Sequence, residues 1–376
     1  MHHRLILVST FALTLAACPP PGSGDDDDAS GIDLLGDGSH SIDNVRLEVI
    51  ADSGDGLDEP TDLQFHPTRP EELWVTNQGT EGVSVLLDAG TSDQEVLNYD
   101  DNQGGIHFLA RPSALAFIEE GQYAGTFATI HDTDEPTQGS ATPDDFMGPT
   151  WWTGDLDEFD GGHHGHLDML HNSPLGMGIA WAGGSSFWVF DGYHSSLTMY
   201  DFNEDHGLGG ADHSDGETAR YVEGEVDRRE GVPSHMEYDH DTGMLYVADT
   251  GNLRICVLDT STGSTGDFTQ PNYDGTLQYE VRDAQLSTLI EVDQVAGTDG
   301  LAMSKPSGLA LHDGKIWVTD ARRGWIVAFD MDGKMLDYLD LELEEFSING
   351  IEFDEDGNLY VVDNLAEEIL RISLHE

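Results

Sequence analysis

PSGLALHDGKIWVTD, residues 306–320, and NGIEFDEDGNLYVVD, residues 349–363, are two copies of one phrase that decides the fold. In each copy, an apolar segment that begins at Pro-x-Gly or a similar start is followed by a turn and an aromatic-aliphatic segment ending in Asp. Apolar residues that alternate on both sides of a short turn predict two antiparallel strands joined by a hairpin. A repeat of such hairpins determines the architecture before any single residue is interpreted.

Four weaker copies bring the number of repeat units to six, and they begin at Pro60, Pro112, Pro174 and Pro233. A third strand is expected after the hairpin, as in residues 254–258 (RICVL) and 325–329 (WIVAF), and a more variable fourth strand completes the unit. Four short strands repeated every roughly 40 to 70 residues are typical of the blades of a β-propeller.

The last repeat unit lacks sequence for its outermost strand. After residues 369–374 (ILRISL) only His375 and Glu376 remain, whereas residues 45–50 (VRLEVI) precede the first repeat. Pairing the two ends would close the ring and remove an exposed sheet edge. We therefore predict one all-β domain over residues 45–376, a six-bladed β-propeller whose N-terminal strand completes the last blade.

The phrase resembles the NHL repeat, which begins with Pro-x-Gly, continues as a hairpin and ends in an aliphatic Val-x-Asp strand. The resemblance extends over nearly all of the chain from about residue 45 and implies an NHL or TolB-like propeller. Residues 161–194 are also similar to uncharacterised bacterial NHL-repeat proteins. Because such propellers include enzymes, carbohydrate binders and scaffolds, the resemblance implies a fold and leaves the function open.

The N-terminus is similar to a bacterial lipoprotein signal peptide. Residues 1–18 contain Arg4, an apolar run and the sequence LAAC, which ends at Cys18. The resemblance implies that the chain is exported and that Cys18 is acylated; the alternative is an ordinary secretory signal with an incidental Cys. Residues 19–44, an acidic Pro-, Gly- and Asp-rich stretch, are expected to be a solvated tether.

These features predict a domain of the bacterial cell envelope that contacts the membrane only through its lipid, because no other stretch is long and apolar enough to span it. Pro19 follows the Cys, which in similar lipoproteins indicates the outer membrane, with the domain either periplasmic or exposed at the surface. Cys256 has no disulfide partner and is expected to be a small buried residue.

The chain is strongly acidic, with 15 Lys and Arg against 73 Asp and Glu and a formal net charge of -58. This charge argues against nucleic acid as a partner. It suits divalent cations or a salty habitat, but a general surface adaptation that keeps the protein soluble is the favoured interpretation. No phosphate-binding loop occurs, and we expect no nucleotide cofactor.

In a propeller, the loops that lead into the innermost strands share a face with the loops that leave the second strands. Asp62 and His235 lie near the starts of innermost strands, where small residues are the rule, so both should project toward the axis. Asp at the end of a second strand is expected to cap the following turn. The six strand-end positions are Asn77, His131, Asp191, Asp249, Asp320 and Asp363.

A concentration of imidazole is predicted at this mouth of the channel, because His and Asp ahead of the third blade join His107, Tyr193 and His194 on the same face. The residues ahead of that blade are His163, His164, His166, Asp168 and His171. Such a cluster has the ligands that Zn or a similar ion requires. The alternative is that the first three of these histidines are solvated in a Gly-rich loop.

A metal-dependent lyase or hydrolase is one function that this cluster could serve, with metal polarising a carbonyl or activating water. The candidate ligands are His131, His171 and His235, with His166 and His194 as weaker candidates. Tyr193 is the candidate proton donor, and Asp62 or Asp191 could act as the base or support a metal ligand from outside the coordination shell.

A distant resemblance links the chain to the peptidyl-hydroxyglycine lyase propellers, in which a metal His occupies the position of His131. Their other metal ligands directly follow the starting Pro, and their Arg follows the strand-end Asp. This chain has other residues at all of these places, which argues against that reaction: Ser113, Leu175, Ser234, Ser307, Thr250 and Ala321.

Two further segments are candidates for function. Residues 201–216 (DFNEDHGLGGADHSDG) should lie on the opposite face, where Asp205, Asp212 and Asp215 could hold Ca, although a solvated loop is the alternative. Residues 135–162 could form a wall or lid over the mouth, or contain a third strand within TWWTGDLDEF.

The sequence favours a binding propeller over the enzyme. Its expected partner is a small molecule, peptide, glycan or envelope protein, bound at the His-rich mouth. A metal-dependent enzyme and a purely structural envelope scaffold remain the alternatives.

Overall fold

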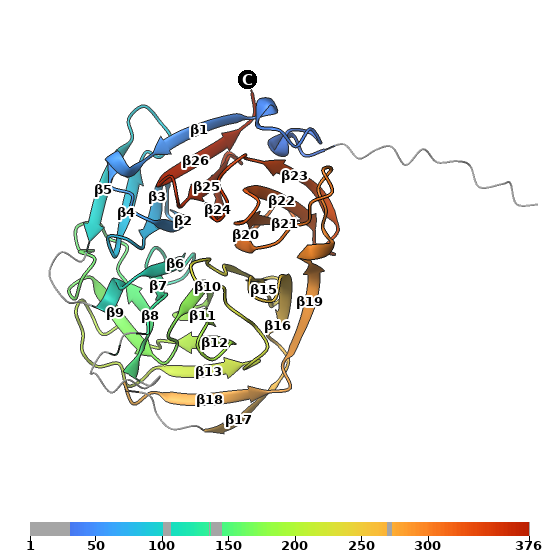
Figure 1. Cartoon of the computed structure of the whole chain (residues 1–376). Coiled ribbons are helices and arrows are strands. Elements are labelled where there is room, and N and C mark those ends of the chain that lie inside the picture. Colours follow the sequence, from blue (N-terminus) through green and yellow to red (C-terminus); the bar gives the residue numbers. More distant parts are fainter. Residues whose placement is uncertain (1–30, 101–106, 135, 137–144, 269–272, 376) are drawn as a thin grey trace, which may run out of the picture. The chain divides into compact units, whose positions relative to one another are not determined.

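The structure is a computed structural model that describes residues 31–100, 107–134, 136, 145–268 and 273–375. The described residues form six mainly antiparallel sheets arranged around a central axis, with short 3-10 helices between them (Figure 1). The predicted all-β, six-bladed propeller is therefore confirmed. None of the helices among the described residues has the length and apolar character needed to cross a membrane.

The first three blades follow the predicted repeat units. Blade one consists of β2 (Pro60–His66), β3 (Arg69–Asn77), β4 (Gly82–Leu87) and β5 (Glu95–Asp100). Blade two consists of β6 (Pro112–Phe117), β7 (Phe127–His131), β8 (Met147–Trp152) and β9 (His166–His171). Blade three consists of β10 (Gly176–Gly183), β11 (Ser186–Asp191), β12 (Ser196–Asp201) and β13 (Glu217–Tyr221).

The last three blades do the same. Blade four consists of β14 (Met236–Asp239), β15 (Met244–Asp249), β16 (Arg254–Asp259) and β19 (Gln285–Glu291). Blade five consists of β20 (Pro306–His312), β21 (Lys315–Asp320), β22 (Trp325–Asp330) and β23 (Met335–Asp340). Blade six consists of β24 (Ile348–Phe353), β25 (Leu359–Asp363), β26 (Glu368–Ser373) and β1 (Arg46–Ala51). The 3-10 helices are η1 (Asp33–Leu35), η2 (Ile42–Asn44), η3 (Ser53–Asp55), η4 (His107–Leu109) and η6 (Val292–Gln294).

The two ends of the domain close the ring as predicted. Strand β1 pairs antiparallel with β26, with Leu47 opposite Ile372 and Val49 opposite Leu370. An ion pair joins Glu48 to Arg371 across this ladder at 2.5 Å. Blade six thereby receives its outermost strand from the N-terminal end of the domain.

Blade three is wider than the repeat predicts. The connection between β16 and β19 of blade four contains a hairpin of β17 (Ser264–Phe268) and β18 (Leu277–Arg282). Strand β18 pairs in parallel with β13, so the hairpin extends blade three to six strands. The sequence did not predict this hairpin, since it carries no copy of the repeat phrase.

The segment 135–162 contains β8, the third strand of blade two. Of the two alternatives for this segment, a lid over the mouth or a third strand, the structure therefore shows the strand. Trp151 and Trp152 belong to β8 and are fully buried, in two different hydrophobic clusters on the two faces of the blade. These two rings are core residues and do not form a lid. Residues 135 and 137–144 lie outside the described residues.

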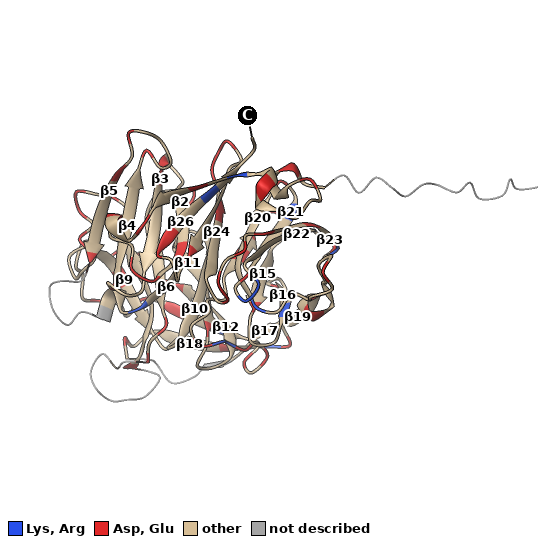
Figure 2. Ribbon diagram, turned by 45° about the horizontal axis from the view of Figure 1, so that its top comes forward, with Lys and Arg blue, Asp and Glu red and all other residues tan. Residues whose placement is uncertain are grey.

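The strand-end positions are placed as predicted, since the six residues are the last residues of β3, β7, β11, β15, β21 and β25. Asp320 accepts four backbone N–H bonds, which is the expected cap. Cys256 is a free, fully buried residue packed in a hydrophobic cluster, also as expected. Asp and Glu occur in many parts of the domain, whereas Lys and Arg occur at few places (Figure 2).

Candidate functional site

The antiparallel order of the strands defines two faces of the ring. On the start face, innermost strands begin and second strands end; on the hairpin face, the first and second strands are joined, and so are the third and fourth. His163 and His164 lie in the β8–β9 connection, which belongs to the hairpin face. The predicted His-rich mouth is thus corrected, because the histidines ahead of blade three lie largely on the opposite face.

His166 is a buried residue of outer strand β9 and does not face the channel. Its Nδ1 lies 2.6 Å from the carbonyl oxygen of His163 and its Nε2 lies 3.0 Å from that of Gly210. The ring stacks on Phe108. Burial lowers the pKa of His166 to about 4, so the ring is neutral at pH 7. His163 and His164 are exposed, as the solvated-loop alternative predicts.

The three candidate metal ligands of the sequence analysis lie in separate environments. His131 contacts Thr129 Oγ1 and the carbonyl oxygen of Gly148 within blade two, each at 3.1 Å. His171, fully buried at the end of β9, pairs with Asp274 through Nδ1 at 2.8 Å. The structure does not bring these two together with His235.

Asp62 and His235 do reach the axis. They come from blades one and four, which face each other across the ring, and Asp62 Oδ1 lies 3.4 Å from His235 Nδ1. Asp62 also accepts backbone hydrogen bonds from Leu63 and Leu115. Burial raises the pKa of Asp62, and the nearby His235 opposes that shift. This pair bridges the channel near its start face.

The other two catalytic candidates lie at blade three, away from the axial pair. Asp191 caps the turn after β11 by accepting hydrogen bonds from the backbone N–H groups of Tyr193 and His194, and its other oxygen lies 2.6 Å from His194 Nδ1. Ser173 donates to the same oxygen. Tyr193 is 48% exposed. Asp191 therefore serves as a turn cap, and it is not assembled with Asp62.

A cavity of about 400 Å³ lies among the ends of the innermost strands at the hairpin face. Its lining residues include one amide, three carboxyls and three aromatic rings, and neither Lys nor Arg is among them. The polar residues are Gln64, Glu119, Glu237 and Glu352, and the aromatic residues are Phe65, Phe117 and Phe353. A smaller cavity shares Gln64, Glu119 and Glu237 and adds Trp181, Tyr238 and His240.

These carboxyls were not predicted as site residues, although the sequence contains a signal for them. Strand residues alternate between faces, so the residue two places after an axis-facing one also faces the axis. Glu237 follows His235 in this way, Gln64 follows Asp62, and Glu352 follows Gly350.

Burial controls the protonation of the channel carboxyls. It raises the pKa of Glu352 to about 8, and the nearby carboxyls of Asp62 and Glu119 raise this pKa further. A hydrogen bond from the backbone N–H of Phe353 acts in the opposite direction and lowers it. Burial also raises the pKa of Glu237 well above its usual range, and Glu352 adds to that rise. Glu352 therefore retains its proton at pH 7 unless a positive charge enters the channel, and burial shifts the pKa of Glu237 in the same direction.

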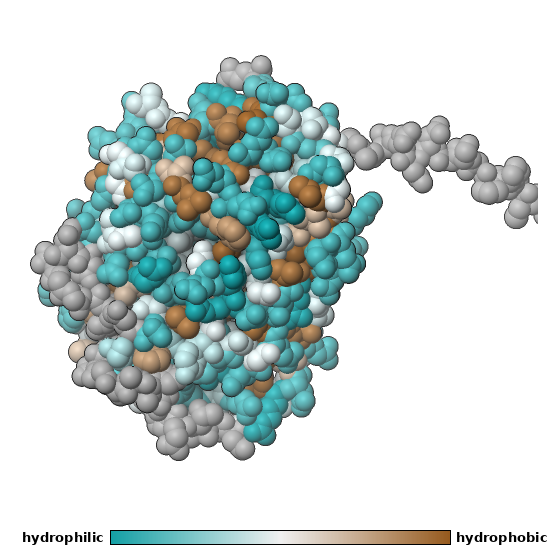
Figure 3. All heavy atoms as spheres, viewed as in Figure 1, coloured by the Kyte–Doolittle hydropathy of each residue, from teal (hydrophilic) through white to brown (hydrophobic). Residues whose placement is uncertain are grey.

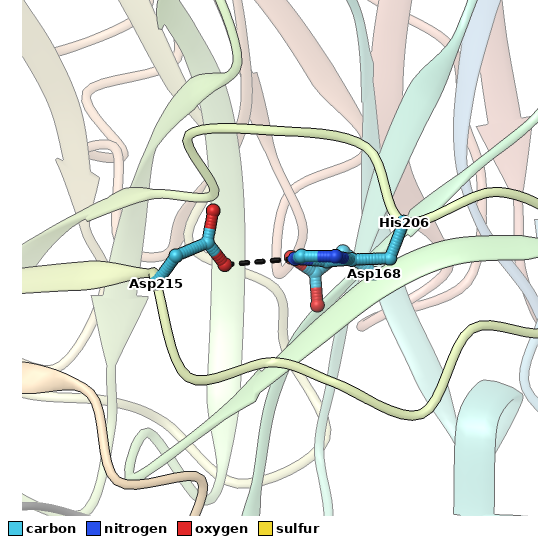
Figure 4. Close-up of side chains that lie close together, drawn as sticks. All are labelled: Asp168, His206 and Asp215. Atoms are coloured by element: carbon cyan, nitrogen blue, oxygen red, sulfur yellow. Dashed lines mark hydrogen bonds and ion pairs between the residues drawn. The ribbon is translucent and has the colours of Figure 1, made fainter.

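A second polar group lies on the hairpin face, where β9 meets the β12–β13 connection (Figure 4). Asp168, His206 and Asp215 each offer one ligand atom, and these atoms lie within 4.8 Å of one another. Among the described residues, no other group of His, Cys, Asp and Glu meets this criterion. The connection lies on the face opposite the predicted mouth, as expected.

Two of the predicted Ca ligands are instead engaged in local turns. Asp205 accepts from the backbone N–H of Gly207, and Asp212 accepts from the N–H and hydroxyl of Ser214. Of the three predicted Ca ligands, only Asp215 belongs to the group shown in Figure 4.

Comparisons with known proteins identify relatives by structure alone, since no family model and no curated protein matches the chain. An auxiliary nutrient binding protein from Bacteroides ovatus is 13% identical, with 89% of this chain and 77% of that chain covered and a TM-score of 0.55. A protein of unknown function from Bacteroides thetaiotaomicron is 10% identical, with 88% and 76% covered and a TM-score of 0.58. Catalytically inactive virginiamycin B lyase from Staphylococcus aureus with quinupristin is 12% identical, with 88% and 100% covered and a TM-score of 0.51. These likenesses support the propeller fold.

Proposed function

We propose that this chain is an exported, lipid-anchored binding propeller whose channel takes a small organic cation, such as a protonated diamine or polyamine. The observation that carries the proposal is the cavity of about 400 Å³ lined by Glu119, Glu237 and Glu352 without a Lys or Arg. Cavities of this size are typical of sites for small molecules.

The chemistry of the lining selects a cation over other small molecules. Carboxyls that are desolvated without a counter-ion keep their protons, and an entering ammonium group allows them to ionise. The pairing of charges then gains from the low dielectric of the channel. Phe65, Phe117 and Phe353 offer ring faces and apolar contact for methylene groups between the ammonium ends. An anion would find no Lys or Arg to pair with among the residues that line the cavity.

Export and lipid anchoring are supported by the LAAC sequence that ends at Cys18, which lies outside the described residues. The shared fold with an auxiliary nutrient binding protein from Bacteroides ovatus fits a binding role. The surface seen in Figure 3 is mainly hydrophilic, with hydrophobic residues in separate patches, which suits a polar small ligand. A lyase or hydrolase that uses His131, His171 and His235 is not proposed, because these rings lie apart.

Calorimetric titration of residues 31–376 with spermidine tests the proposal. We expect saturable binding, and we expect Glu237→Gln and Glu352→Gln each to weaken it at least about tenfold, which is a loss of ~1.4 kcal/mol. Glu355→Gln is the matched control, because Glu355 is exposed on the turn between β24 and β25 of the same blade. Its affinity should stay within about twofold of the wild type.

The affinity for spermidine should also rise between pH 6 and pH 8, because Glu352 must lose its proton to pair with the ligand. A neutral polyol of similar length that binds as tightly as spermidine would show that the site does not select charge. Equal affinity in the wild type and in Glu237→Gln would place the ligand outside the channel.

Glu352 should also make stability depend on pH. Its pKa rises from 4.5 to about 8 on folding, so the folded state holds a proton that the unfolded state releases between these values. Stability therefore falls as pH rises through this window. The full shift corresponds to ~5 kcal/mol, but part of the Glu352 side chain remains accessible to solvent, which screens the charge, so we expect ~1–2 kcal/mol.

Urea unfolding at pH 5, 7 and 9 measures this effect. Glu352→Gln should match the wild type at pH 5 and exceed its stability at pH 9, whereas Glu355→Gln should follow the wild type throughout. Parallel pH profiles for the wild type and Glu352→Gln would refute the assignment of the shifted pKa.

A further inference from the structure

The group formed by Asp168, His206 and Asp215 has one feature that points to a ligand. Asp168 is fully buried in β9, and its Oδ2 has no hydrogen-bond partner among the described residues. His206 Nε2 lies 3.9 Å from this oxygen, which is too far for a hydrogen bond. A buried carboxylate oxygen that lacks a partner is costly, so its position calls for an explanation such as an ion.

The other oxygen of Asp168 is already held. His213 Nδ1 lies 2.5 Å from Asp168 Oδ1, which fixes the carboxylate so that Oδ2 points away from His213 and toward His206. In metal sites, a ligating carboxylate is commonly held in place by a hydrogen bond from a residue that does not itself bind the metal. His213 therefore acts as a positioning residue.

The loop that supplies His206 and Asp215 is held against blade two by other contacts. The backbone N–H of Gly209 donates to the carbonyl oxygen of His166 at 2.9 Å, and His166 Nε2 contacts the carbonyl oxygen of Gly210 at 3.0 Å. A Cβ atom at Gly210 would lie 2.8 Å from the Cβ atom of His206, so this close turn requires glycine. The loop thus holds His206 in place without a ligand.

The distances suit a small tetrahedral ion. Zn lies about 2.0–2.2 Å from nitrogen and carboxylate ligands, which places tetrahedral ligand atoms roughly 3.4 Å apart. The separations here are 2.8 Å between His206 Nε2 and Asp215 Oδ1 and 3.9 Å between His206 Nε2 and Asp168 Oδ2. Asp215 is the most exposed of the three, at 36%, and leaves a side of the site open to water as a fourth ligand.

We propose that Asp168 Oδ2, His206 Nε2 and Asp215 Oδ1 bind a Zn²⁺-like divalent transition metal that fixes the β12–β13 connection of blade three to the outer strand of blade two (Figure 4). One imidazole and two carboxylates with an open position suit such an ion, whereas Ca²⁺ takes six to eight oxygen ligands. In the described part of the chain, the ion-pair partners of Asp168 and Asp215 are histidines, so no Lys or Arg competes with the metal. The site is independent of the channel and of its ligand.

The test uses residues 31–376 without a tag, stripped with a chelator and titrated calorimetrically with Zn²⁺ at pH 7.5. We expect one Zn²⁺ per chain, and at least about tenfold weaker binding in His206→Gln and in Asp215→Asn. Both side chains are partly exposed, so these variants should fold, as circular dichroism will verify. The matched controls are His164→Gln and Asp212→Asn, which alter the same residue types nearby and should bind as the wild type does.

A second readout reports the structural role. Zn²⁺ should raise the Tm of the wild type and of both controls, because a ligand that binds the folded state stabilises that state. It should not raise the Tm of His206→Gln, which lacks one of the three metal ligands. The absence of Zn²⁺ binding, equal affinity in His206→Gln, or binding of Ca²⁺ in preference to Zn²⁺ would each overturn the proposal.

Discussion

A chain that begins at Asp52 is expected to lose its cooperative unfolding transition, whereas residues 31–376 retain it. The shortened chain lacks β1, the fourth strand of blade six, and leaves β26 as an open edge. In the intact domain Ile369, Leu370 and Ile372 of β26 are buried. Loss of the ladder, of the Glu48–Arg371 ion pair and of this burial should cost more than ~5 kcal/mol, which is a large part of the stability of a typical domain. An unpaired edge also favours aggregation.

Urea unfolding and light scattering measure the two consequences, and complementation shows that the strand is the cause. A peptide of residues 31–51 added to the shortened chain should restore a cooperative transition in a concentration-dependent manner, because it can pair with β26. A peptide of residues 31–44 retains the η1 segment but lacks β1 and is the matched control. If the shortened chain unfolds with the same midpoint as residues 31–376, ring closure by β1 contributes little to stability.

The closed ring can be predicted from the sequence because its signal is local and repeated. Each hairpin carries its own alternation and its own strand-end residue, so six weak signals support one another. The predicted strand at residues 45–50 can then pair with only one blade, because the last blade alone lacks a fourth strand. For the same reason the projection of Asp62 and His235 toward the axis follows from their places in the repeat.

Features that depend on contacts between blades are harder to predict. The hairpin of β17 and β18 leaves blade four and pairs with β13, and no residue in it marks that partner. The histidines before β10 were misplaced for a related reason, since His166 belongs to β9 of the preceding blade. Successive strands of a blade run in opposite directions. If a residue is assigned to the wrong strand, the loop beside it is therefore placed on the wrong face of the ring.

The site residues show the same limit. His206 and Asp215 are 9 positions apart in the sequence, but Asp168 comes from a different blade, so no motif spacing connects the three. By contrast, the channel carboxyls Glu237 and Glu352 lie within the repeat phrase. Side chains two positions apart on a strand share a face, so counting two residues on from each axis-facing position identifies both carboxyls without coordinates.

Asp320→Ala is expected to destabilise the domain by ~3 kcal/mol or more, because a single buried carboxylate satisfies backbone donors from two separate segments. Its Oδ2 accepts from the N–H of Ser304 at 2.6 Å, and its Oδ1 accepts from those of Lys305, Arg322 and Arg323 at 3.0–3.2 Å. Arg323 has a further bond to the carbonyl oxygen of Asp320, so three N–H groups lose their bonds within the structure. The cap therefore joins the start of β20 to the turn after β21.

Urea unfolding at pH 7 measures the loss, and two variants show whether it arises from the cap. Asp332→Ala removes the same charge from an exposed turn of blade five, and its stability should remain within ~0.5 kcal/mol of the wild type. Asp320→Asn keeps one acceptor oxygen but turns an NH₂ group toward donors, so it should fall between the wild type and Asp320→Ala. Similar stabilities for Asp320→Ala and Asp332→Ala would mean that water replaces the carboxylate, and the strand-end Asp would then be a feature of the repeat with little effect on stability.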